Sequence, residues 1–128
     1  MGKRKPEFEA LNRNCPIRDV LDRLGDRWTV LVLMTLGEQT LRFSALRREI
    51  EDISPRMLAQ TLRHLEKDGL VSRQVYPTVP PRVEYRMTPL GHSFFDPLQH
   101  LIQWADEHHE QVRQAREAYV APESHEAL

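Results

Sequence analysis

The sequence has little that would place the protein in a membrane or outside a cell. Its 128 residues include one cysteine, Cys15, so no disulfide can form within a single chain. The longest apolar run, Val30 to Met34, is far shorter than the ~20 residues of a membrane-spanning helix. The opening residues lack the apolar segment of a secretory signal peptide. We therefore expect a protein of the reducing cytoplasm that has no membrane partner.

The residue patterns of common enzyme active sites are also missing. The sequence has no glycine-rich phosphate loop, and no Ser/His/Asp or Cys/His/amide set falls on recognisable elements. We expect neither an enzyme nor a bound cofactor.

Charge is distributed unevenly, although the formal net charge is only −1. Residues 42–86 hold nine Lys and Arg against six Asp and Glu, whereas residues 89–128 hold two against seven. The middle of the chain is therefore the part suited to a polyanion.

The best-defined element of the sequence is a helix within the stretch from Ser54 to Asp68. Ser54 is a favourable N-cap, Pro55 suits the first helical position, and Gly69 suits a left-handed end. At ~100° per residue, one side of this helix carries Leu58, Leu62 and Leu65. The opposite side carries Arg56, Gln60, Arg63 and Lys67.

Arg, Lys and Gln side chains match the donors and acceptors of base edges, and a helix fits the major groove of DNA. The polar side therefore predicts a DNA-reading helix. The alternative is a merely solvated helix face.

Local signals predict the other elements. In order, they are a helix from Pro16 to Leu24, a helix at 27–36 capped by Asp26, a short strand at 40–42, a helix at 43–50, a hairpin of 71–76 with 82–87, and a long helix from Pro89 to about Glu117. The helix at 27–36 is apolar nearly all round, which predicts burial on most sides. Pro97 should bend or break the last helix, because its ring opposes the carbonyl of Ser93.

Two helices joined by a tight link and followed by a hairpin form a winged helix-turn-helix. The expected fold class is therefore mainly α with a small β-hairpin wing, and Arg82 ends the proline-rich wing loop. The last helix has an apolar seam that predicts a homodimer, although it could instead fold over its own core. A flexible arm at 1–14 and a frayed tail at 118–128 would flank one domain at 15–117.

Several motifs together resemble the HxlR-type family of bacterial winged helix-turn-helix transcriptional regulators, which are related to the MarR group. They are Cys15-Pro16, Gly25-Asp-Arg-Trp-Thr29, Arg42-Phe43, Ile53-Ser-Pro-Arg-Met-Leu58, Leu65-Glu-Lys-Asp-Gly-Leu-Val71 and Tyr76-Pro-Thr-Val-Pro-Pro-Arg-Val-Glu-Tyr85. The resemblance spans about Cys15 to Ala105. It implies a homodimer that binds a two-fold-related operator on double-stranded DNA, with the first and last helices forming the dimer interface.

The candidate DNA-contacting residues lie on the polar helix side, near its beginning and at the wing. They are Ser54, Arg56, Met57, Gln60, Thr61, Arg63, His64, Lys67 and Arg82. A winged helix used only for protein contacts remains the alternative.

Cys15 is the candidate effector site. It stands at a helix N-terminus near Arg13 and Arg18, where positive charge favours the thiolate. Some relatives in the family are thought to sense electrophiles or disulfide stress through a cysteine at this position. The alternative is a buried cysteine that acts as a small hydrophobic residue.

A metal-responsive regulator is a further alternative, because Asp96 and His100 are four residues apart and His108 follows two turns later. His108 and His109 are adjacent and point in different directions, and no second cysteine is present. A structural or surface role for these histidines is favoured, and no metal site is predicted.

Overall fold

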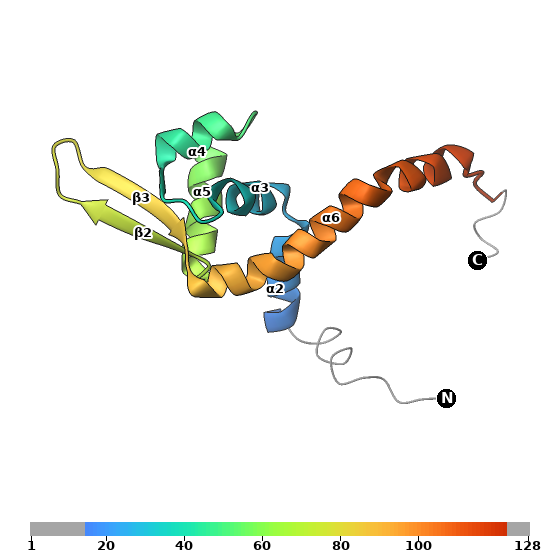
Figure 1. Ribbon diagram of the computed structural model, residues 1–128, viewed down its shortest axis with the longest axis horizontal. Coiled ribbons are helices and arrows are strands. Elements are labelled where there is room, and N and C mark those ends of the chain that lie inside the picture. The colour runs from blue at the N-terminus through green and yellow to red at the C-terminus, as the bar shows by residue number, and fades with distance from the viewer. Residues whose placement is uncertain (1–14, 123–128) are drawn as a thin grey trace. The chain divides into compact units, whose positions relative to one another are not determined.

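Residues 15–122 are described by the computed structural model, apart from the side chains of Cys15, Pro16 and Leu24. Within that range the element order is α2 (Cys15–Gly25), α3 (Arg27–Leu36), β1 (Leu41–Arg42), α4 (Phe43–Glu49), α5 (Pro55–Lys67), β2 (Val71–Tyr76), β3 (Arg82–Met87) and α6 (Pro89–Ala118) (Figure 1). The expected arm at 1–14 and the end of the expected tail, 123–128, lie outside the described residues. The chain divides into two compact units, Met1–Phe95 and Asp96–Leu128.

α5 has the predicted caps and the predicted core side. The Ser54 hydroxyl accepts a hydrogen bond of 3.0 Å from the backbone N–H of Met57, and Pro55 is the first helical residue. Gly69 has φ +79°, a left-handed conformation that favours glycine. The three leucines Leu58, Leu62 and Leu65 are buried. Each is worth roughly 1.5–3 kcal/mol of transfer free energy, so this side fixes the helix to the core.

α3 lies at the centre of that core and packs against α2, α4, α5 and β3. Asp26 caps it, since its carboxylate accepts hydrogen bonds from the Trp28 backbone N–H at 3.0 Å and from the Thr29 hydroxyl at 3.2 Å. The buried residues of α3 are Thr29, Val32, Leu33 and Leu36. Only Arg27 and Met34 of this helix are exposed, and its other residues are buried or half-buried, so the expected burial on most sides is confirmed.

The predicted hairpin of β2 and β3 is confirmed, and its register places Val71 opposite Met87 and Tyr76 opposite Arg82. The short strand is also present, but it adds to the wing as a third strand, giving the order β1-β3-β2. Leu41 pairs with Tyr85 and Arg42 with Glu84. The loop of the hairpin lies at the end of the wing opposite the start of α6 (Figure 1).

α6 begins close to the end of α5. The Thr88 hydroxyl donates a hydrogen bond of 2.6 Å to the carbonyl of Gly69 and accepts one of 2.9 Å from the Gly91 N–H. A Cβ atom at Gly91 would collide with the Leu70 carbonyl, so the two segments can approach this closely only with glycine there.

α6 continues as one helix from Pro89 to Ala118 with Pro97 inside it, so of the expected bend or break the break does not occur. One missing backbone hydrogen bond costs about 3 kcal/mol, which the remaining bonds of a 30-residue helix can offset.

No helix in the described range is long and apolar enough to cross a membrane.

Candidate DNA interface

The side of α5 opposite the core is polar and cationic, as the helical spacing predicted. Arg56, Gln60, Arg63 and Lys67 are all exposed along this helix. Ser54 and Met57 are exposed at its beginning. Six of the predicted site residues therefore lie exposed on or beside α5, two others on α5 face elsewhere, and Arg82 lies on the wing.

Thr61 and His64 do not belong to this exposed side. Thr61 is only 3% exposed, because it lies about 40° around the helix from Leu65 and faces the core. His64 is half-buried and lines a cavity together with Lys67. Thr61 therefore cannot reach a base edge from its position, and the inclusion of Thr61 was wrong.

Arg82 lies at the first residue of β3, where the wing loop ends. Its guanidinium stacks over the Tyr76 ring, with Cζ 4.3 Å from the ring centroid. Its Nε is 3.5 Å from a carboxylate oxygen of Glu84, which makes an ion pair without hydrogen-bond geometry. Arg82 is therefore oriented by two neighbours but is still partly open to solvent.

Two ion pairs hold the C-terminal end of α5. Arg23 of α2 donates from Nε to Asp68 at 2.7 Å, and Arg73 of β2 donates from Nε to Glu66 at 3.1 Å. The hydrogen bond to Asp68 raises the pKa of Arg23 above its ordinary value, so this guanidinium stays charged. Both pairs are partly solvated, so each stabilises the fold by only ~0–1 kcal/mol. Their main effect is on the position of the helix end.

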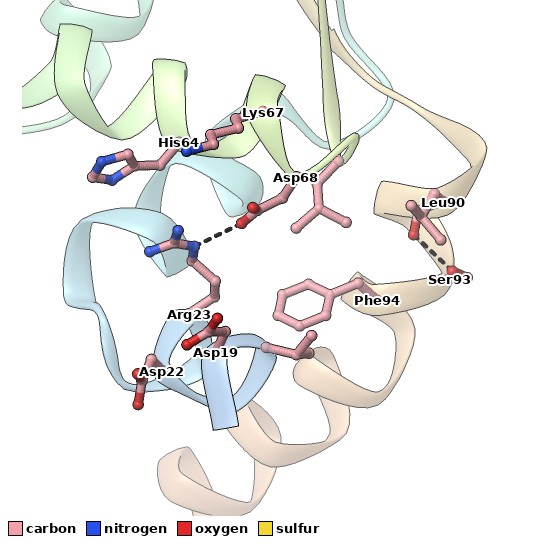
Figure 2. A pocket seen from close by; sticks show the side chains of 11 residues that line it. Asp19, Asp22, Arg23, His64, Lys67, Asp68, Leu90, Ser93 and Phe94 are labelled. Atoms are coloured by element: carbon pink, nitrogen blue, oxygen red, sulfur yellow. Dashed lines mark hydrogen bonds and ion pairs between the residues drawn. The ribbon is translucent and has the colours of Figure 1, made fainter. Parts of the chain in front are cut away.

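The Arg23–Asp68 pair crosses a cavity of about 750 Å³ between α2, the end of α5 and the start of α6 (Figure 2). One part of its lining is charged and the other is apolar. The apolar part is formed by Val20, Leu70, Leu90 and Phe94. The polar and charged part includes Asp19, Asp22, Arg23, His64, Lys67 and Asp68.

Residues 23–113 match the family model described as HxlR-like helix-turn-helix. The chain belongs to the HxlR-like helix-turn-helix family. The matched residues contain α3 to α5, the whole wing and most of α6. The expected family and the winged helix-turn-helix fold are thus confirmed, and the chain is a helix-turn-helix transcriptional regulator.

Relatives of this HxlR-like chain carry the same description. The HTH-type transcriptional regulator YtfH of Escherichia coli K12 is 45% identical over 106 residues, which cover 83% of this chain and 84% of that protein. The solved structure of the transcriptional regulator ytfH from Salmonella typhimurium is 46% identical, with a TM-score of 0.74 and coverage of 81% and 93%. The redox regulator HypR in its reduced form is 32% identical, with a TM-score of 0.72 and coverage of 78% and 99%.

For this HxlR-like chain, the structure tests the metal hypothesis but not the effector hypothesis. Cys15 is the first residue of α2, but its side chain lies outside the part that the structure describes. Among the described residues, no group of three or more His, Cys, Asp or Glu side chains is placed to hold a metal ion. His108 instead stacks on Trp104 at 4.7 Å and its Nδ1 lies 2.8 Å from the Trp104 carbonyl oxygen.

Sequence reasoning missed three residues that shape the interface. Arg73 and Glu66 connect the wing to α5, and Arg42 faces the wing from β1. A short local sequence contains no signal for such pairs, because each partner comes from a different element.

Proposed function

We propose that this regulator reads a specific DNA sequence by placing α5 in the major groove. The observation that carries the proposal is the exposed set Arg56, Gln60 and Arg63 on the side opposite the buried leucines. Bidentate contacts from Arg to guanine and from Gln to adenine give sequence preference, whereas phosphate contacts do not. Ser54 at the helix start and Arg82 at the wing would then contact the DNA backbone.

We further propose that the protein binds its operator as a homodimer. Support comes from large apolar side chains that remain exposed on α2 and α6, namely Ile17, Val20, Leu21, Leu90, Leu101 and Trp104. Exposed apolar surface of this kind is typical of sites that a partner covers. A two-fold dimer would bind half-sites about one helical turn apart, ~34 Å.

The test is selection of the preferred duplex from a random pool, followed by titration of operator and scrambled DNA. Gln60→Ala should lower operator affinity and relax base preference, whereas its matched control Gln39→Ala, in the turn after α3, should do neither. Equal losses of Gln60→Ala on operator and scrambled DNA would contradict base reading. A footprint over a single half-site would contradict the dimer.

Cys15 is proposed as the residue through which an electrophile or oxidant alters DNA binding. The support is its helix N-terminal position and the similarity of the chain to a protein described as a redox regulator. A thiolate adds to a quinone carbon to form a C–S bond, while the thiol proton and the displaced ring proton end on the two oxygens. Operator affinity should change on titration with a quinone in the native protein but not in Cys15→Ser. An equal response of both proteins would exclude Cys15 as the sensor.

The expected cytoplasmic location stays a prediction.

A further inference from the structure

The cavity crossed by the Arg23–Asp68 pair is large enough for a small molecule. Its volume of about 750 Å³ falls within the range of roughly 300–1,000 Å³ that small-molecule sites occupy. All of its lining comes from one compact unit of the chain, namely from α2, the end of α5, Leu70 and the start of α6. The proposed reading of DNA by the opposite side of α5 does not use this space.

The apolar part of the cavity is only partly covered by the protein itself. Leu70 is buried, but Val20 is 53% and Leu90 is 57% exposed. The ring of Phe94, which is half-buried, points from α6 toward α2 (Figure 2). Apolar area left open beside a cavity favours a ligand with an apolar body, since binding removes that area from water.

The polar part of the same cavity carries more acidic than basic groups. Three aspartates line it against one arginine and one lysine, and His64 is the remaining titratable group. Arg23 already donates a hydrogen bond of 2.7 Å to Asp68. The pKa of Arg23 is raised by that hydrogen bond and, to a smaller extent, by the charge of Asp19, so one guanidinium serves more than one carboxylate.

The charges of the lining are also separated in space. Lys67 belongs to α5, where its side chain extends toward His64 (Figure 2). Asp19 and Asp22 belong to α2 and are exposed. The α2 side of the cavity therefore combines carboxylates with apolar surface, which suits a positively charged group attached to an apolar body.

A second copy of the chain is a less suitable occupant. The surface proposed for dimerisation shares Val20 and Leu90 with the cavity, whereas Leu21, about 100° around α2 from Val20, is exposed but does not line it. An apolar face of another protein would take the two α2 carboxylates out of water without a partner, which is costly. A cation would pair with them instead.

We propose that this cavity binds an amphipathic organic cation, in which an aromatic or aliphatic body carries one ammonium group. The body contacts Leu70, Leu90 and Phe94, and the ammonium group faces Asp19 and Asp22. Both parts are needed, because an ion pair with exposed carboxylates is weak by itself. This binding site is independent of the proposed DNA-binding function.

Occupancy of the cavity should also affect the DNA-reading helix, a consequence that does rest on the proposed function. An ammonium group beside Asp19 competes with Arg23 for negative charge, and Arg23 holds the end of α5 through Asp68. A ligand that loosens this pair favours a different position of α5 from the one that binds DNA. Because such coupling is reciprocal, the bound cation should lower operator affinity.

The test uses isothermal titration calorimetry of the full chain with three probes that share a naphthalene body. At neutral pH 1-naphthylmethylamine is a cation, 1-naphthalenemethanol is neutral and 1-naphthoate is an anion. The amine should bind about fivefold more tightly than the alcohol, and the naphthoate should bind most weakly.

Variants separate the two parts of the site. Asp19→Asn combined with Asp22→Asn should weaken amine binding about fivefold and leave alcohol binding unchanged. The matched control, Glu38→Gln combined with Glu49→Gln, removes two exposed carboxylates outside the cavity and should change neither. Leu90→Ser should weaken all three probes, because it removes apolar wall. Circular dichroism of each variant shows that the fold is retained.

Several results would overturn the cation site. They are an absence of amine binding to the native chain, tighter binding of naphthoate than of the amine, and equal amine affinity in the aspartate variant and its control. Amine affinity that falls as the chain self-associates at higher concentration would also overturn it, because a second copy would then fill the cavity.

Operator affinity in saturating amine tests the coupling. We expect a loss of about fivefold in the native protein and a smaller loss in the aspartate variant. An unchanged operator affinity with the amine bound would overturn the coupling alone. A native protein that binds the amine but no operator would overturn the proposed DNA-binding function and leave the cation site standing.

Discussion

α5 and α6 are both amphipathic helices, yet their exposed residues differ in kind. α5 buries its leucines and exposes Arg56, Gln60 and Arg63. α6 exposes large apolar side chains, with Leu101 at 54% and Trp104 at 52% exposure. In each helix the core-facing side packs into the fold. The exposed side indicates what kind of partner the helix suits. A polar, cationic side suits DNA, whereas exposed leucine and tryptophan suit another protein surface.

Two of the exposed apolar residues of α6 lie side by side on the helix surface and form a patch. Leu101 and Trp104 are three residues apart and therefore neighbours on the helix surface. Burial recovers about 25 cal/mol for each Å² of apolar area, and tryptophan is enriched among residues that dominate interface energy. If this comparison is right, changes on the exposed side of α5 should affect DNA binding, and changes on the exposed side of α6 should affect self-association.

The largest effect is expected for dimerisation. The double change Leu101→Asp with Trp104→Asp should weaken self-association by roughly 4 kcal/mol or more, because it places charge where apolar area would be buried. Analytical ultracentrifugation over a concentration series measures this. Gln60→Asp on α5 is the matched control and should leave the dimer intact while abolishing operator binding. A native protein that sediments as a monomer at micromolar concentration would refute the dimer.

The two sides of α5 should differ almost as sharply in folding stability. Leu62→Ala removes a buried side chain and should lower the free energy of unfolding by ~2–5 kcal/mol. Its neighbour Arg63→Ala should change that free energy by no more than ~0.5 kcal/mol. Urea denaturation gives both values. Similar losses in the two variants would mean that Arg63 contributes to the core.

Loss of a residue that reads bases should have an effect of intermediate size on operator affinity. Arg56→Ala should cost ~1–3 kcal/mol of operator affinity and relax preference at the base pair it contacts, without weakening the dimer. Electrophoretic mobility shifts on operators changed one base pair at a time measure this. An unaltered base preference would remove Arg56 from the set that reads sequence.

The smallest effect is expected for the pair that joins α2 to the end of α5. Arg23 and Asp68 should show a coupling free energy of unfolding of at most ~1 kcal/mol in a double-mutant cycle, since both side chains are partly solvated. The same variants should change operator affinity more than stability, because the pair positions α5. Parallel losses in stability and affinity would show that the pair only supports the fold.

Features that depend on neighbours in sequence were predictable. The bounds of α5 follow from Ser54, Pro55 and Gly69, whose effects act within one turn. The Asp26 cap and the two strands of the hairpin are of the same kind. Thr61 was misplaced although helical spacing alone puts it about 40° from Leu65, on the leucine side of the helix. Pro97 does not break α6, because the local cost of a proline does not include the rest of the helix.

The sequence by itself determined the helix-turn-helix, the wing, the family and the cationic side of α5. Tertiary structure decided which distant residues meet. Arg23 meets Asp68 across 45 residues, and Arg42 comes opposite Glu84 only because β1 pairs with β3. Caps, turns and helical periodicity act over a few residues and can be read along the chain. Ion pairs and shared grooves form only when separate elements pack, and no local preference specifies them.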